Sequence, residues 1–240
     1  MKYGIQLYSI RDMAKIDFEK AVKTVAEIGY NMIEFAGFYG RSADDVNKLL
    51  ADNGVELWGT HTRIDDLVND FDATVAFHKA IGNKNYIIPI HDLSTKEKID
   101  EFVELINVYQ PKLEKEGIKL GYHNHSFEFI PNEDGSEIYK NIVERTNVYL
   151  EIDTYWVFNA GLDPVETLEK YKDRLLCIHI KDGLENSKGK PLGMGIAPVD
   201  KVYKKALELG VPMIVESETL TPSGKEECRI CFEYLKNLEQ

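Results

Sequence analysis

The sequence has little of several features that define other classes of protein. Its 240 residues include only three cysteines, too few for a disulfide framework. Cys228 and Cys231 have the spacing of a redox or zinc pair, but they lie inside a helical pattern without a second pair, which favours buried helical thiols. No apolar run is long enough to span a membrane, and no signal-peptide pattern precedes the first predicted strand. We therefore expect a cytoplasmic protein without a membrane partner.

Positive charge is also scarce. The chain has 29 lysines and arginines against 41 aspartates and glutamates, which gives a formal net charge of −12. This net negative charge repels the phosphate backbones of DNA and RNA, so we expect no nucleic-acid partner. Hydrophobic residues make up 43% of the chain, enough for a sizeable core, and the length fits one domain over residues 1–240. A small-molecule partner is expected, and a homo-oligomer is left open.

Short apolar runs alternate eight times with amphipathic helical segments. Strands are predicted at residues 3–8, 31–35, 55–60, 85–90, 118–123, 148–153, 175–180 and 212–216. Helices are predicted at residues 17–28, 42–52, 71–81, 95–116, 136–146, 164–171, 198–209 and 223–238. Eight strand–helix repeats without a long linker predict an α/β fold, a closed (β/α)8 TIM barrel in one domain.

Polar residues gather where the predicted strands end, and in such barrels the active site lies at that end. These residues are Glu34, His61, His91, His123, His125, Glu128, Asp153, His179, Lys181, Asp182, Glu216 and Glu218. They include five of the six histidines, and only His78 falls on a helix. Alternation along a strand sends His123 and His125 to the same face. Imidazoles grouped with carboxylates indicate a metal or acid–base site, so the pattern predicts an enzyme.

Several longer motifs stand out in the chain: GIQLYSIRD at 4–12, GYHNHSFEF at 121–129, DTYW at 153–156 with AGLDP at 160–164, HIKD at 179–182 and GMG at 193–195. Together they resemble the sugar phosphate isomerase/epimerase family, within the xylose isomerase-like TIM-barrel superfamily. The resemblance covers nearly the whole chain. It implies one divalent cation, Mn²⁺, Zn²⁺ or Co²⁺, at the barrel mouth. The implied metal ligands are Asp153, His179, Glu216 and a residue of the fifth strand, here His123.

Two positions depart from the pattern of the superfamily's epimerases. Those enzymes have a proton-moving glutamate on the fifth strand, where this chain has His123 or His125, with Glu128 farther on. They also have a histidine after the sixth-strand aspartate, where this chain has Trp156. The histidine-rich fifth strand looks more like the dehydratase branch.

The chemistry that the resemblance implies begins with loss of the proton next to a carbonyl, where a metal stabilises the enediolate. The candidate base is Glu216 or Glu128, and the imidazole of His125 or His123 returns the proton or protonates a leaving hydroxyl. The sequence thus predicts a metal-dependent sugar or sugar phosphate isomerase/epimerase. The alternative is a dehydratase or β-eliminating lyase acting on a keto-inositol, a keto-sugar or a 3-keto-glycoside. A non-enzymatic sugar-binding barrel is a third interpretation.

Four further residues are predicted to bind the substrate: Glu34, His61, Trp156 and Lys181. Each has an alternative. Glu34 either bonds substrate hydroxyls or orients a histidine, and His61 either faces the ligand or is a hydrogen-bonded core histidine. Trp156 either stacks on a sugar ring or lines the mouth, and Lys181 either stabilises anionic charge or pairs with Asp182.

Overall fold

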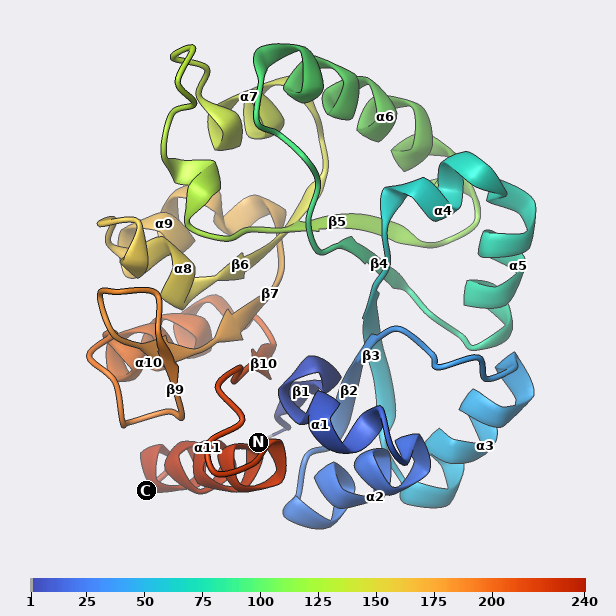
Figure 1. Ribbon diagram of the computed structural model, residues 1–240, viewed down its shortest axis with the longest axis vertical. Coiled ribbons are helices and arrows are strands. Elements are labelled where there is room, and N and C mark those ends of the chain that lie inside the picture. Colours follow the sequence, from blue (N-terminus) through green and yellow to red (C-terminus); the bar gives the residue numbers. More distant parts are fainter. Residues whose placement is uncertain (1) are drawn as a thin grey trace.

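A closed barrel of eight parallel strands forms the centre of the computed structural model, which describes residues 2–240 (Figure 1). The strands are β1 (Gly4–Gln6), β2 (Met32–Ala36), β3 (Glu56–His61), β4 (Asn85–Ile88), β5 (Lys119–His123), β6 (Tyr149–Asp153), β7 (Leu175–Ile180) and β10 (Met213–Val215). Each strand pairs with its neighbours in the chain, and β1 pairs with both β2 and β10, which closes the barrel. The predicted TIM barrel is confirmed, with all eight predicted strands in place.

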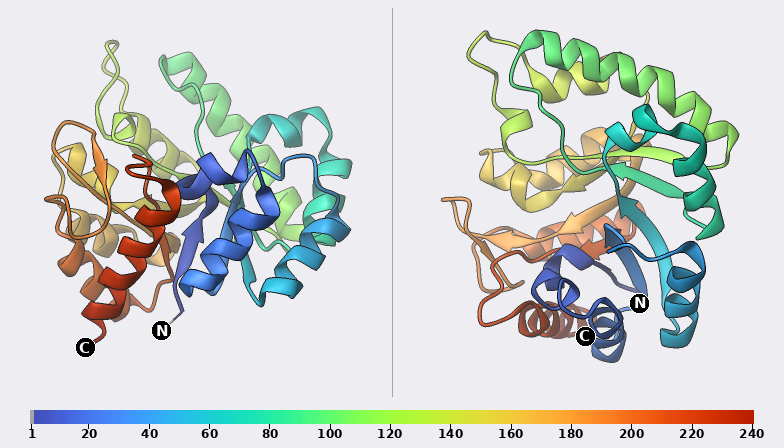
Figure 2. Two further views of the ribbon diagram at one scale, coloured as in Figure 1. Left: turned by 60° about the horizontal axis from the view of Figure 1, so that its bottom comes forward. Right: turned by 45° about the vertical axis from the view of Figure 1, so that its right-hand side comes forward.

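Helices surround the barrel and cover its outer face (Figures 1 and 2). The eight predicted from sequence are α2 (Phe18–Ile28), α3 (Ala43–Asn53), α5 (Phe71–Ala80), α6 (Lys96–Lys115), α7 (Ile138–Arg145), α9 (Pro164–Tyr171), α10 (Val199–Leu209) and α11 (Gly224–Leu238). Local chemistry sets where they begin. The side chains of Asp17, Ser42, Thr95 and Ser223 each accept a hydrogen bond from the backbone N–H three residues later, as N-caps do. The last helix, α11, packs against α2 and so completes the ring of helices.

The sequence pattern does not predict several short elements, all of which follow barrel strands at the mouth except η3, which precedes β7. They are the helices α1 (Arg11–Ala14), α4 (Ile64–Asn69) and α8 (Thr154–Asn159), the 3₁₀ turns η1 (Leu7–Ile10), η2 (Phe127–Phe129) and η3 (Lys172–Arg174), and the antiparallel pair β8 (Asp182–Gly183) and β9 (Gly189–Lys190). Each spans six residues or fewer, so no period can show. The predicted first strand was too long, because the chain enters η1 after Gln6.

Asp182 holds the loop after β7 together. Its carboxylate accepts hydrogen bonds from the backbone N–H groups of Gly183, Gly193, Gly195 and Ala197. A side chain at Gly195 would clash, because its Cβ would lie 2.2 Å from Asp182 Oδ1. Gly195 is thus explained by the close approach of its backbone to this carboxylate.

The main hydrophobic core lies between the barrel and the helices. A second, smaller cluster of Met32, Cys177 and Ile214, with Trp58 packed against it, joins side chains from four barrel strands. Cys177, Cys228 and Cys231 are all buried and free, and the last two lie on α11, inside a helix as predicted. In residues 2–240 no helix combines the length and apolarity needed to cross a bilayer.

Candidate active site

The carboxyl ends of the barrel strands bring together two groups of charged residues, all buried except the partly exposed His61 and Glu218. One group, called here the histidine cluster, consists of Glu34, His61, His123, Glu151 and His179. The other, called the lysine cluster, consists of Asp153, Lys181, Glu216 and Glu218. His179 connects the two, because its Nδ1 lies 3.4 Å from Glu216 Oε2.

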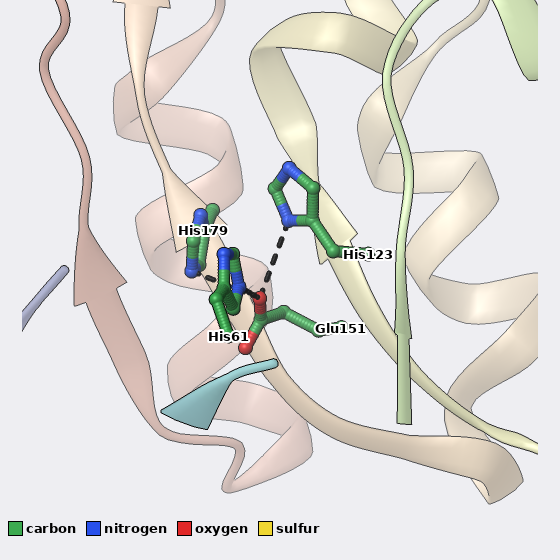
Figure 3. A group of neighbouring side chains, drawn as sticks. All are labelled: His61, His123, Glu151 and His179. Carbon is green, nitrogen blue, oxygen red and sulfur yellow. Dashed lines mark hydrogen bonds and ion pairs between the residues drawn. The ribbon is translucent and has the colours of Figure 1, made fainter. Parts of the chain in front are cut away.

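Three imidazoles of the histidine cluster point at one carboxylate oxygen (Figure 3). Glu151 Oε1 lies 2.6 Å from His61 Nε2, 3.0 Å from His179 Nε2 and 3.2 Å from His123 Nδ1. These side chains come from strands β3, β5, β6 and β7, so only closure of the barrel places them together. The second oxygen of Glu151 accepts a hydrogen bond from the Cys177 thiol at 3.1 Å.

Glu34 adds a second carboxylate to the histidine cluster. Its Oε2 lies 2.8 Å from His179 Nε2 and 3.3 Å from His61 Nε2, and it accepts a hydrogen bond from the Gln6 amide at 2.8 Å. The other oxygen, Oε1, is buried without a hydrogen-bond partner among the described residues. Glu34 is therefore buried in the barrel interior, in contact with His61, His179 and Gln6.

Burial and mutual contact set the charges of the histidine cluster. Burial, together with the negative charge of Glu151, raises the pKa of Glu34 to about 7. Burial alone would raise the pKa of Glu151 too, but His179 and His61 hold it well below its usual range. The pKa of His179 lies well above its usual value, because the Glu151 charge outweighs burial. Burial depresses the pKa of His123, which is therefore neutral at pH 7.

A buried lysine balances the carboxylates of the lysine cluster. Lys181 Nζ lies 3.0 Å from Glu216 Oε2 and 3.5 Å from Asp153 Oδ2, and it also pairs with Glu218. Although burial opposes ionisation of Glu216, the Lys181 ammonium holds its pKa well below the usual range. Burial raises the pKa of Asp153 to about 6 against the pull of the same lysine. Glu216 is thus an ionised carboxylate at neutral pH.

Both clusters border a cavity of about 420 Å³ at the barrel mouth. It is lined by Tyr8, Ala36, Gly37, His61, Pro89, Ile90, His123, His125, Glu216 and Glu218. Two buried polar atoms near it have no hydrogen-bond partner among residues 2–240, the Nδ1 of His125 and the Nε1 of Trp156. The ring centroids of these two residues lie 5.8 Å apart, and His125 Nδ1 lies 3.9 Å from Glu128 Oε1, too far for a hydrogen bond.

The structure brings most of the predicted site residues together. Glu34, His61, His123, Asp153, His179, Lys181 and Glu216 all belong to the two clusters, and His125 and Trp156 stand beside them. The predicted substrate contact of Trp156 stays a prediction; its ring lies 4.7 Å from Lys181 Nζ. Lys181 pairs with the clustered carboxylates, whereas Asp182 bonds the loop backbone.

Two residues from the strand ends lie elsewhere. Glu128, one of the two predicted bases, accepts hydrogen bonds from the Tyr122 hydroxyl at 2.7 Å and from the backbone N–H of His125 at 2.8 Å. It borders a separate cavity beside α7 and α9, so its position is suited to holding the His125 loop. His91 stacks on Phe102, with ring centroids 4.5 Å apart.

Sequence reasoning missed Glu151. The signal was present, because alternation along β6 puts Glu151 on the same face as Asp153. Glu151 lies two residues before the strand end, however, at a level where barrel interiors are usually filled with apolar side chains. The register of β6 against β7 confirms that Glu151 lies deeper in the barrel than Asp153, since Glu151 pairs with Cys177 and Asp153 pairs with His179.

The donor atoms fit a divalent cation. Two sets of four residues each offer ligand atoms within 4.8 Å of one another: His61, His123, Glu151 and His179, and His123, Asp153, His179 and Glu216. The second set is the one predicted from the resemblance. Its Asp153 Oδ2 is buried and accepts no hydrogen bond, and the Lys181 ammonium lies 3.5 Å from it. Imidazole and carboxylate donors suit Zn²⁺, Mn²⁺ or Co²⁺.

A closed (β/α)8 barrel with a polar cluster at the carboxyl ends of its strands defines the class of this protein. Residues 22–237 match the family model described as xylose isomerase-like TIM barrel, so the chain belongs to that family. The superfamily suggested by the sequence motifs is confirmed.

Similar proteins include dehydratases and isomerases. The chain is 23% identical over 188 residues to an inosose dehydratase of Clostridium botulinum, an alignment that covers 69% of this chain and 63% of that protein. A solved sugar phosphate isomerase/epimerase from Parabacteroides distasonis has a TM-score of 0.85 and 25% identity, with 98% of this chain and 97% of that chain covered. A probable 3-DHS dehydratase from Bacillus anthracis shares the fold, with a TM-score of 0.78, 14% identity and 99% of both chains covered.

Proposed function

We propose that this protein is a metal-dependent carbohydrate isomerase or epimerase that moves a proton next to a carbonyl group. One observation carries the proposal. Glu216, an ionised carboxylate, and His125, an imidazole whose Nδ1 makes no hydrogen bond and lies 3.9 Å from Glu128 Oε1, line the same cavity. A base and a proton carrier on one cavity are the minimum that such a transfer requires.

Each residue has a distinct part in the proposed reaction. Glu216 accepts the substrate proton, because the Lys181 ammonium keeps this carboxylate ionised. His125 returns a proton through Nδ1, and Glu128 fixes its loop by accepting the His125 backbone N–H. His61, which lines the cavity, supplies a donor for substrate hydroxyls, and the buried Trp156 Nε1, which has no hydrogen-bond partner, is a second donor.

A divalent cation would be held by His123, Asp153, His179 and Glu216. When bound, it polarises the substrate carbonyl and stabilises the negative charge that develops on oxygen. Asp153 is suited to be a metal ligand because its Oδ2 accepts no hydrogen bond. The substrate proposed for this site is a sugar or sugar phosphate with a carbonyl beside a hydroxyl.

Dehydration is the second candidate, and two observations favour it. The curated relatives are inosose dehydratases. In addition, β5 and the residues after it present imidazoles, and His125 could protonate a departing hydroxyl as readily as it returns a proton to carbon. A keto-inositol, a keto-sugar or a 3-keto-glycoside would then lose water or an aglycone.

Incubation in deuterated water tests both candidates. Metal-loaded protein is mixed with ketoses, keto-inositols and 3-keto-glycosides, and products are analysed by mass spectrometry and NMR. Deuterium in a recovered isomer or epimer supports the leading proposal, and loss of water or an aglycone supports dehydration. If neither result is obtained with any substrate or metal, the proposal of an enzyme is wrong, and the interpretation as a non-enzymatic sugar-binding barrel is supported.

Two variants assign the roles. His125→Asn should still exchange the substrate proton with solvent, because Glu216 can take and return it on one face, but product formation should fall by about 10²-fold or more. Glu216→Gln should lose both exchange and product. Equal exchange and product formation in His125→Asn and the unchanged protein would contradict the role of His125.

A further inference from the structure

The histidine cluster contains a second set of metal donors. A metal bound by Asp153 and Glu216 would share His123 and His179 with this set but would leave His61 and Glu151 unused. We propose that this cluster binds a divalent cation of its own, deeper in the barrel than the lysine cluster. The donor atoms are His61 Nε2, His123 Nδ1, His179 Nε2, Glu151 Oε1 and Glu34 Oε2. The inference does not depend on the proposed reaction.

Distances between the donors have the size of a coordination shell. His61 Nε2, Glu151 Oε1, His179 Nε2 and Glu34 Oε2 form a ring with sides of 2.6, 3.0, 2.8 and 3.3 Å. Nitrogen and oxygen ligands that lie about 2.0–2.1 Å from Zn²⁺ are separated by about 2.9–3.4 Å in four- to six-coordinate sites. The ring needs to widen by a few tenths of an ångström to hold such an ion.

Protons alone satisfy these contacts poorly. An imidazole nitrogen carries at most one hydrogen, yet His61 Nε2 and His179 Nε2 each face both Glu34 Oε2 and Glu151 Oε1. Each hydrogen can point fully at one oxygen only, so two of the four contacts lack a well-aligned hydrogen bond. A cation at the centre attracts every donor at once through a lone pair.

Charge balance also favours an ion in the histidine cluster. Glu34 and Glu151 are completely buried, and no lysine or arginine of residues 2–240 forms an ion pair with either. Asp153 and Glu216 have the Lys181 ammonium instead. Buried carboxylates need a compensating charge, and a divalent cation neutralises both with the imidazoles uncharged.

Neighbouring groups hold the two carboxylates in place. The Gln6 amide donates to Glu34 at 2.8 Å, and the Cys177 thiol donates to the free oxygen of Glu151 at 3.1 Å. Such partners orient ligands in known metal sites. Three imidazoles and two carboxylates suit Zn²⁺ or Co²⁺ better than Mg²⁺ or Ca²⁺, which prefer oxygen ligands.

Zinc loading of the full chain tests the inference without any substrate. Chelator-treated protein is reloaded with Zn²⁺, and its crystals are measured at the zinc absorption edge. We expect anomalous density between His61, Glu151 and His179. In parallel, bound zinc is counted by mass spectrometry in His61→Ala, Glu151→Gln and Asp153→Asn, with His91→Ala as the matched histidine control.

The expected counts separate the two clusters. His61→Ala and Glu151→Gln should each hold one ion fewer per chain than the unchanged protein, whereas Asp153→Asn should keep the ion at His61, and His91→Ala should lose none. Circular dichroism verifies that each variant is folded. Anomalous density confined to the Asp153–Glu216 side, an unchanged zinc count in folded His61→Ala, or no bound ion in the unchanged protein would overturn the inference. Because no readout uses turnover, failure of the proposed reaction leaves this result intact.

Discussion

The lysine cluster and the histidine cluster balance the charge of buried carboxylates in different ways. Both bury two or more carboxylates at the same end of the barrel. In the lysine cluster, a fixed ammonium supplies the compensating charge at every pH below its own pKa, which its carboxylate partners raise against the effect of burial. In the histidine cluster, the compensating positive charge comes from protonated imidazoles or, in the proposed metal-bound form, from the cation. The first arrangement suits a permanently ionised base, and the second suits an exchangeable ion.

Removing Lys181 should break the lysine cluster and cause the largest loss. Lys181→Met leaves Asp153 and Glu216 buried beside each other without their shared ammonium, so the free energy of unfolding should fall by about 3–5 kcal/mol. Urea denaturation measures it. The control is Lys172→Met, which removes an exposed pair with Glu169 and should cost about 0–1 kcal/mol. Equal effects of the two variants would show that Lys181 does not balance the cluster.

Glu216→Gln should separate chemistry from stability within the lysine cluster. The swap keeps the shape of the side chain but removes the base, so kcat/KM should fall by about 10²–10⁴-fold while the fold persists. Glu218→Gln is the matched control, since Glu218 lines the same cavity and pairs with the same lysine but is partly exposed. Activity like that of the unchanged protein in Glu216→Gln contradicts its role as base.

Stability against pH should distinguish the histidine cluster. The pKa of Glu34 is raised from 4.5 to about 7, so its contribution to metal-free stability is fully present below pH 4.5 and is lost as pH rises to about 7. The raised pKa of His179 acts in the same direction above pH 6.5. The lowered pKa of Glu216 acts oppositely, because its contribution is present above pH 4.5 and lost at lower pH.

Glu34→Gln should therefore flatten the pH profile of metal-free protein. The difference in unfolding free energy between the unchanged protein and the variant should decrease by up to about 3 kcal/mol from pH 4.5 to 7. Chemical denaturation at several pH values measures it, with the exposed Glu27→Gln as control. A constant difference across this range would mean that Glu34 does not titrate as the geometry indicates.

Cys177→Ala should have the smallest effect. It removes the thiol that donates to Glu151, which should lower zinc affinity of the histidine cluster about tenfold and the unfolding free energy by about 1 kcal/mol. Cys228→Ala removes a buried thiol on α11 and should leave zinc affinity unchanged. Competition with a zinc-binding dye measures the affinity, and equal affinities in both variants would exclude a role for the Cys177 thiol.

The eight strands and the eight long helices were predictable because local chemistry specifies them. Hydrophobic period and capping side chains such as Ser42 act within a few residues, so they can be read without knowing the fold. The helices α1, α4 and α8 could not be predicted, since four to six residues show no period. Asp153, His179 and Glu216 could be placed at one end of the barrel because they lie at the carboxyl ends of predicted strands, where the active sites of such barrels lie.

Neighbours in sequence were a poor guide to neighbours in the site. Glu128 follows His125 closely, yet its carboxylate bonds the Tyr122 hydroxyl and the His125 backbone N–H and does not line the cavity of Glu216. Glu151 was missed although it lies two residues from Asp153, because its importance depends on imidazoles from other strands.

The sequence by itself determined the strand–helix alternation, the end of the barrel that carries chemistry, and the residue types gathered there. Only the tertiary structure decided which carboxylates meet a lysine and which meet imidazoles. His61 and Glu151 are 90 residues apart in the chain, and Glu34 and His179 are 145 apart. Their contacts exist because the barrel closes, and closure depends on the pairing of all eight strands, which no local stretch of sequence specifies.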